Sequence, residues 1–133
     1  MRGPCFSVAY ACASSNHAIG QAVCLIKMGM ADAIFAGGSD AAGKAVGLVA
    51  FDKMNALSQR NDSPKTASRP FDKDRDGFVL GEGAGILCIE ELEHAKKRGA
   101  LIYGEVTGVG FNCDSYDVAA PHPEEKALPS PCD

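Results

Sequence analysis

One cysteine in this sequence occupies a position where it could act as a nucleophile. Cys12 follows a β-prone run over residues 6–11 and precedes a stretch of small, helix-compatible residues over 13–28. A thiol on such a strand-to-helix turn lies at the positive end of the helix, where free N–H groups favour the thiolate over the thiol. That geometry suits a cysteine nucleophile. The alternative is that Cys12 is a buried small apolar residue, which is the usual role of a free cysteine.

The three histidines do not provide an evident base for this thiol. His17 lies about a turn and a half further along the same predicted helix, so its ring is expected to point away from Cys12. His94 belongs to a charged helical segment, and His122 lies in a proline-rich tail. A cysteine acyltransferase needs partners that transfer protons and stabilise an oxyanion. The residues alone therefore do not identify a proton-transfer partner for Cys12.

An acidic run suggests a calcium site but matches it only in part. Asp72–Gly77 resembles the first half of an EF-hand loop. The bidentate glutamate that should close such a loop is replaced by Gly83, and Glu82 is one residue too early. The sequence instead predicts a solvated turn whose carboxylates bind Arg69, Arg75 or backbone amides.

A glycine-rich run suggests a phosphate-binding loop but likewise matches that motif only in part. Gly81–Gly85 precedes a predicted strand, and no helix N-terminus follows it. Its glycines are expected to allow a close backbone approach beneath a site. Neither a Cys-x-x-Cys nor a His-x-x-x-His spacing occurs, and the sequence predicts no metal and no cofactor.

The composition is that of an ordinary globular α/β protein. The chain has 133 residues, of which 46% are hydrophobic and 23% are charged, with a net charge of −4. Its basic residues are scattered, which argues against nucleic acid as a partner, and no apolar run is long enough for a membrane span. Since no secretion signal opens the chain, we expect reduced thiols at positions 5, 12, 24, 88, 113 and 132.

Periodicity and turn residues predict alternating strands and helices. We expect strands over residues 6–11, 32–36, 86–89 and 102–111, of which the third should be buried, and helices over residues 14–28, 42–57 and 90–98. The helix over 42–57 is either continuous or broken at Gly43 and Gly47. The order of the first three elements predicts a right-handed parallel crossover. Glycines should end the second strand at 37–38 and the outer two helices at 29 and 99. From Ala119 onward the prolines forbid a regular element.

Several longer motifs follow one another in a fixed order. They are Gly3-Pro4, Ala11-Cys12-Ala-Ser-Ser15, Ala36-Gly-Gly-Ser39, Ala56-Leu-Ser58, Asn61-Asp62, the run from Ala67 to Gly85 and the run from Glu91 to Gly99. Together they resemble the β-ketoacyl-acyl-carrier-protein synthases, and among them the fatty-acid elongating type. Ketosynthase domains of modular polyketide synthases share several of these motifs and remain an alternative.

The resemblance implies an α/β, thiolase-like layered fold that is incomplete in this chain. We expect residues 1–118 to form a partial ketosynthase domain, comprising the end of the N-terminal half and the start of the C-terminal half. Residues 119–133 are expected to form an irregular tail that diverges from the family. Met1 falls inside the run that leads to the cysteine, so we expect a native whole enzyme to start earlier. The departure over residues 124–133 indicates a truncated or frame-shifted gene end.

The resemblance also assigns roles to particular residues. Cys12 falls on the family's nucleophile, which takes an acyl group from acyl-carrier protein as a thioester and condenses it with malonyl-carrier protein in fatty acid biosynthesis. The N–H of Cys12 would form half of an oxyanion hole. Phe51 falls beside the family's acyl pocket, although an ordinary core phenylalanine is the alternative. Relatives carry an arginine for carrier-protein docking where this chain has Asn55, with Lys53 nearby.

The resemblance further predicts a homodimer through the Phe6–Ala11 strand and a cytoplasmic, plastid or mitochondrial location. The family's two catalytic histidines, a supporting lysine and the second oxyanion-hole N–H come from a part that this chain does not include. We therefore expect that the chain alone does not condense acyl groups. An alternative is a non-catalytic, dimer-forming chain that binds full-length synthase subunits through an exposed apolar face.

Overall fold

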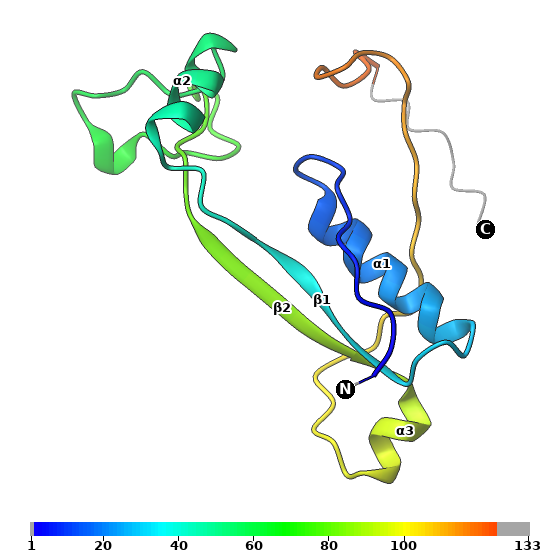
Figure 1. Ribbon diagram of the computed structural model, residues 1–133. Coiled ribbons are helices and arrows are strands. Elements are labelled where there is room, and N and C mark those ends of the chain that lie inside the picture. The colour runs from blue at the N-terminus through cyan, green and yellow to red at the C-terminus, as the bar shows by residue number, and fades with distance from the viewer. Residues whose placement is uncertain (1, 125–133) are drawn as a thin grey trace. The chain divides into compact units, whose positions relative to one another are not determined.

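The computed structural model describes residues 2–124, which form two compact units. One unit contains the residues up to 38 and from 86 onward, and the other contains residues 39–85. The helices are α1 (Ser14–Lys27), α2 (Ala45–Lys53) and α3 (Leu92–Lys97), and a short 3₁₀ turn covers Pro64–Thr66. The strands are β1 (Ala33–Asp40) and β2 (Gly83–Glu90), which pair with each other as Figure 1 shows.

The two strands run antiparallel, because the start of β1 lies beside the end of β2. The Glu91 N–H donates to the Asp32 carbonyl at 2.9 Å. The prediction that Gly37-Gly38 ends the second strand is wrong, since β1 continues through both glycines to Asp40. Pairing with β2 supplies hydrogen bonds that compensate for the weak strand preference of glycine.

The predicted helix over residues 14–28 is confirmed as α1, and its end is built as expected. Gly29 has a φ of +69°, its N–H donates to the Ile26 carbonyl, and the Met30 N–H donates to the Leu25 carbonyl. This pair of hydrogen bonds is the Schellman arrangement, for which a glycine at the first residue after the cap is favoured. Helix α3 ends in the same way at Gly99, as predicted.

Helix α2 is shorter than the predicted helix over residues 42–57. The helix ends at Lys53 because Asn55 adopts a φ of +54°, and the N–H groups of Asn55 and Ala56 donate back to Asp52 and Phe51. Asparagine is the residue other than glycine that most often takes this position. At the other end, the Asp40 carboxylate accepts the Ala42 N–H at 3.0 Å, which forms a turn before the helix.

The strands predicted over residues 6–11 and 102–111 are not formed, nor is the parallel crossover that needed the first of them. Both segments lack a neighbouring strand among the described residues, and a strand forms only where a neighbour accepts and donates its backbone hydrogen bonds. Strand β2 was expected to be buried over 86–89, but its residues 83–88 are exposed. Residues 119–124 contain no helix or strand, and residues 125–133 of the predicted tail lie outside the described residues.

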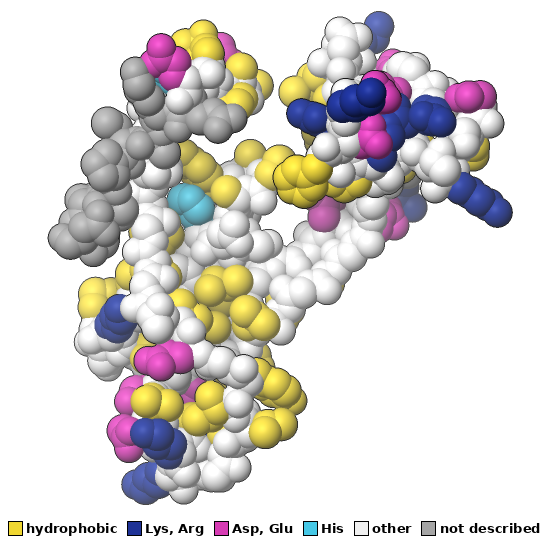
Figure 2. Space-filling model, turned by 180° about the vertical axis from the view of Figure 1, so that it is seen from behind, with side chains coloured by type: hydrophobic (Ala, Val, Ile, Leu, Met, Phe, Trp, Pro, Cys, Tyr) yellow, Lys and Arg dark blue, Asp and Glu magenta, His cyan; other side chains and the backbone are white. Residues whose placement is uncertain are grey.

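The buried apolar core of residues 2–124 consists of small side chains. Its members are Ala22, Val23, Ala36, Ala67 and Ala95. Larger apolar side chains of the sheet remain exposed, including Phe35 at 59%, Ile86 at 58% and Leu87 at 52%, and apolar side chains are visible at the surface in Figure 2. Exposed apolar surface of this kind favours association with another protein surface. Within the described part of the chain, no helix is long and apolar enough to cross a membrane.

Candidate active site

Cys12 lies on a sharp turn at the beginning of α1, and its side chain is exposed. The preceding residue, Ala11, has a φ of +44°, a conformation that residues with a side chain rarely adopt. The chain reverses there and enters the helix at Ser14. The thiol therefore stands just before the first turn of a helix, where the partial positive charge of the helix dipole is concentrated. The turn expected around Cys12 is thus present, although the strand expected before it is not.

The hydroxyl of Ser14 ties the two sides of this turn together. Its Oγ accepts the Tyr10 N–H at 2.7 Å and donates to the Ala11 carbonyl at 2.7 Å. Two backbone hydrogen bonds, from Ala13 to the Tyr10 carbonyl at 3.0 Å and from Ser14 to the Ala11 carbonyl at 3.2 Å, close the same turn. The sequence motif included Ser14, but its local role could not be assigned without the turn geometry.

The histidines are engaged in contacts other than with Cys12. The ring of His17 stacks on Tyr10 at a centroid distance of 4.4 Å and meets the ring of Phe111 edge-on at 5.0 Å. His94 Nδ1 lies 2.5 Å from the Glu90 carboxylate. The ring of His122 meets Tyr116 edge-on at 5.0 Å. That none of the three serves as a base for Cys12 stays a prediction.

Cys113 belongs to the surroundings of the turn, and sequence reasoning did not single it out. The Tyr10 hydroxyl is hydrogen-bonded to the Cys113 thiol, and the Ser115 hydroxyl donates to the same sulfur at 3.8 Å. The hydrogen bond from Tyr10, followed by the N–H and hydroxyl of Ser115, lowers the pKa of Cys113. The bond to Cys113 in turn raises the pKa of Tyr10. No local signal connects positions 10 and 113, because the contact depends on tertiary folding.

Phe51, the predicted acyl-pocket residue, lies in the unit formed by residues 39–85. Its ring meets Phe78 edge-on at a centroid distance of 5.2 Å. A cavity of about 430 Å³ in the same unit is lined by Phe78 together with Leu48, Val49 and Leu80. Phe51 is not among the lining residues and contacts the cavity wall through Phe78. The assignment of Phe51 to substrate binding therefore stays a prediction.

The acidic run forms the solvated turn that the sequence predicted. Asp76 accepts hydrogen bonds from the Ser58 hydroxyl at 2.7 Å and the Gln59 N–H at 2.9 Å and pairs with Arg69 at 3.0 Å. The bonds from Ser58 and Gln59 lower the pKa of Asp76. Asp72 accepts the Asp74 N–H at 2.7 Å. These carboxylates bind protein groups of the unit formed by residues 39–85, and no cluster of metal-ligating side chains occurs within residues 2–124.

The surroundings of the glycine-rich run differ from those that the sequence predicted. The close backbone approach predicted for Gly81–Gly85 is absent, because a methyl group placed on Gly81, Gly83 or Gly85 would meet open space. The last three residues of this run instead begin β2. Close contacts occur instead at other glycines, among them Gly20 within α1 and Gly38 in the same unit. A methyl group on Gly38 would overlap the Ser15 hydroxyl, and one on Gly20 would come within 2.5 Å of Phe111 Cζ.

Comparison with known proteins gives the family. Residues 1–95 match the family described as "Beta-ketoacyl synthase, N-terminal domain". The chain belongs to the β-ketoacyl synthase family. It is 54% identical over 122 residues to the chloroplastic 3-oxoacyl-[acyl-carrier-protein] synthase II of Arabidopsis thaliana, which covers 92% of this chain and 23% of that protein.

Solved β-ketoacyl synthase structures agree with this assignment. A β-ketoacyl synthase from Burkholderia phymatum matches with a TM-score of 0.83 and 44% identity over 88% of this chain and 28% of its own. A ketosynthase complex with a type II polyketide synthase acyl-carrier protein matches with a TM-score of 0.75 and 42% identity, over 79% of this chain and 26% of that chain. This β-ketoacyl synthase chain therefore spans about a quarter of the length of such relatives. The coarse α/β prediction is confirmed, whereas its division into two halves stays a prediction.

Proposed function

We propose that this chain is the nucleophile-bearing part of a fatty-acid elongating β-ketoacyl-acyl-carrier-protein synthase. The observation that carries the proposal is Cys12 on an exposed turn immediately before α1, in a chain that belongs to this family. An exposed sulfur at a helix N-terminus is accessible to a thioester and lies beside the positive end of the helix dipole. The similar proteins named as 3-oxoacyl-[acyl-carrier-protein] synthases support the substrate class.

The first step is transfer of an acyl group to Cys12. The Cys12 thiolate attacks the carbonyl carbon of an acyl-carrier-protein thioester, forming a new carbon–sulfur bond. The bond to the carrier's sulfur breaks, and the carrier leaves as a thiolate that takes a proton from solvent. The Cys12 N–H is one of the donors that stabilise the oxyanion during this attack.

The second step consumes the thioester on Cys12. A malonyl-carrier-protein thioester loses carbon dioxide, and the electron pair released forms a carbanion that attacks the acyl carbonyl. The Cys12–carbon bond breaks, which restores the thiolate and gives a β-ketoacyl-carrier protein. The family resemblance leads us to expect the groups that stabilise this carbanion, and the second oxyanion donor, from parts of the synthase other than the turn around Cys12.

Acyl transfer can be tested on the purified chain with octanoyl-loaded acyl-carrier protein as the probe. Peptide mass spectrometry should find the octanoyl mass increment on the peptide that contains Cys12. Cys12→Ala should abolish the increment, and Cys88→Ala, which removes another exposed thiol of the same unit, should retain it. Acylation of several exposed cysteines at equal rates would overturn the proposal for Cys12.

Condensation is a separate test. With acyl- and malonyl-loaded carrier proteins together, the chain alone should form no β-ketoacyl product, because the proton-transfer groups expected for the family lie outside it. Product formation by the purified chain would contradict this expectation.

The exposed apolar side chains favour a second candidate function. Phe35, Ile86 and Leu87 are each more than half exposed on the two-stranded sheet, and the segment over residues 6–11 has no strand partner within the described residues. A chain with this surface could act as a non-catalytic subunit that pairs with another copy or with a full-length synthase. Light scattering after size-exclusion chromatography measures this directly, and a monomer that also fails to bind a full-length synthase would exclude it.

A further inference from the structure

Ser14 is placed to fix the conformation of the turn that presents Cys12. Its hydroxyl is the acceptor for the Tyr10 N–H and the donor to the Ala11 carbonyl, both at 2.7 Å. One side chain thereby bridges the residues before the turn and the first residue of α1. A serine near a helix start commonly caps the helix amides, but here the hydroxyl bonds to the turn that precedes the helix.

The conformation that these bonds hold is unfavourable in isolation. The left-handed region, in which Ala11 lies at φ +44°, is sterically unfavourable for a residue with a side chain. Such a conformation persists only where the surroundings hold it, and it relaxes when they are removed. Loss of the Ser14 hydroxyl would remove both of its hydrogen bonds to the turn. The position of Cys12 relative to the helix end therefore depends on this hydroxyl.

Tyr10, which supplies one of those bonds, is itself held from two directions. Its ring stacks on His17 of α1 at 4.4 Å with an interplanar angle of 17°. Its hydroxyl bonds to Cys113, which also accepts from Ser115. Phe111, from the same distant segment, meets the ring of His17 edge-on at 5.0 Å. The start of the turn is thus anchored to α1 and to residues 111–115.

We propose that Ser14 and Tyr10 are positioning residues that hold the Cys12 thiol at the N-terminal end of α1. This inference rests on the proposed nucleophilic role of Cys12. Neither residue is assigned to contact the acyl group. Both act through the turn, Ser14 by bridging it and Tyr10 by fixing its first residue.

The test measures the rate at which iodoacetamide alkylates Cys12, followed by peptide mass spectrometry and divided by the rate at Cys5, an exposed thiol of the same unit. Ser14→Ala should lower this ratio by about two- to fivefold, the range expected when a negative charge loses its interaction with a helix terminus. Ser14→Thr, which keeps a hydroxyl, should restore it. Ser15→Ala is the matched control, because the Ser15 hydroxyl lies against Gly38 rather than on the turn.

A second set of variants tests the Tyr10 anchor independently. Tyr10→Phe removes the bond to Cys113 and keeps the ring on His17, so its ratio should lie between those of the wild type and Tyr10→Ala. Tyr103→Phe is the control, since Tyr103 is 94% exposed. Circular dichroism confirms that each variant retains its helices. A ratio unchanged in both Ser14→Ala and Tyr10→Ala, or equal rate changes at Cys5 and Cys12, would overturn the inference.

The alkylation ratio is independent of the acyl-transfer assay. If octanoyl transfer fails while the ratio depends on Ser14, the positioning role stands and the proposed function fails. If octanoyl transfer succeeds while the ratio is insensitive to both residues, the proposed function stands and the positioning role fails.

Discussion

Replacing Gly20 by alanine has two opposite effects on the free energy of unfolding, because alanine favours the helix but crowds the neighbouring side chain. Gly20 is a buried residue in the interior of α1, where alanine is favoured over glycine by about 0.8–1 kcal/mol. The added methyl group, however, would lie 2.5 Å from Phe111 Cζ and 2.9 Å from Phe111 Cε1. Distances this short force the ring to move away from its contact with His17.

The two effects have opposite signs, and their sizes decide the outcome. Overpacking a filled site costs about 1–3 kcal/mol. Because this cost exceeds the gain in helix preference, Gly20→Ala should lower the free energy of unfolding by about 1 kcal/mol. In a chain that also carries Phe111→Ala the collision disappears, and the same substitution should raise that free energy by about 1 kcal/mol.

Urea denaturation followed by circular dichroism at the helix band measures all four members of this double-mutant cycle. The decisive result is the reversal of sign between the two backgrounds, which removes the cost of Phe111→Ala itself from the comparison. If Gly20→Ala stabilises the wild-type chain as much as the Phe111→Ala chain, the ring does not pack on Gly20. The anchoring of the Cys12 turn by residues 111–115 would then lose the part that Phe111 contributes.

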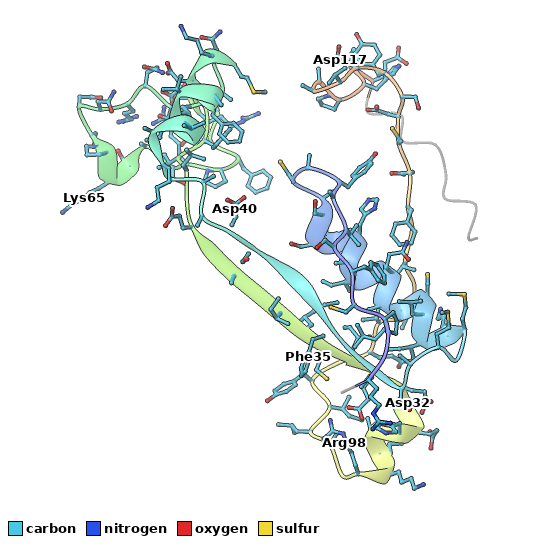
Figure 3. The ribbon with its side chains drawn as sticks, viewed as in Figure 1. Asp32, Phe35, Asp40, Lys65, Arg98 and Asp117 are labelled. Carbon is cyan, nitrogen blue, oxygen red and sulfur yellow. The ribbon has the colours of Figure 1, made fainter. Side chains whose placement is uncertain are left out.

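Further predictions concern α3 and the end of α2. Hydrogen bonds from Arg98 and then His94 lower the pKa of Glu90 from 4.5 to about 2, so Glu90 stabilises the fold above pH 4.5 and this contribution is lost as the pH falls towards 2. Arg98, the first of these partners, is labelled in Figure 3. Glu90→Gln should therefore make the thermal midpoint fall less steeply as the pH is lowered from 4.5 towards 2. A variant whose thermal midpoint depends on pH as that of the wild type does would contradict this prediction. Asn55→Gly should raise the free energy of unfolding by up to about 1 kcal/mol, because Asn55 has a φ of +54° at the residue after the α2 cap, where glycine is less strained. Urea titration checks this, and a lower midpoint would refute the helix-end geometry.

Local signals predicted α1 and the ends of α1 and α3 well, for a physical reason. Helix hydrogen bonds join residues that are close in sequence, and a glycine in the left-handed conformation ends a helix without distant contacts. The same signals predicted a longer helix than α2, because the left-handed conformation of Asn55 ends the helix before residue 57. The ion pair of Asp76 with Arg69 was also predicted, since the two residues are close in the sequence, whereas the bond from the Ser58 hydroxyl comes from a more distant segment and was not predicted.

Strands were predicted less well, because their hydrogen bonds depend on neighbours that the local sequence does not specify. The β-prone run over residues 6–11 has the composition of a strand but lacks a strand partner among the described residues. Conversely, Gly37 and Gly38 have low strand preference yet lie inside β1, because β2 provides the pairing.

The sequence by itself determined the family and the position of Cys12 at the start of a helix, since both depend on residue types in a fixed local order. Only the tertiary structure decided what surrounds that cysteine. Tyr10, His17, Phe111 and Cys113 come together because the chain folds back along α1, and no local pattern relates residues so distant in the sequence. The left-handed conformation of Ala11 likewise exists only where the Ser14 hydroxyl and its neighbours hold it.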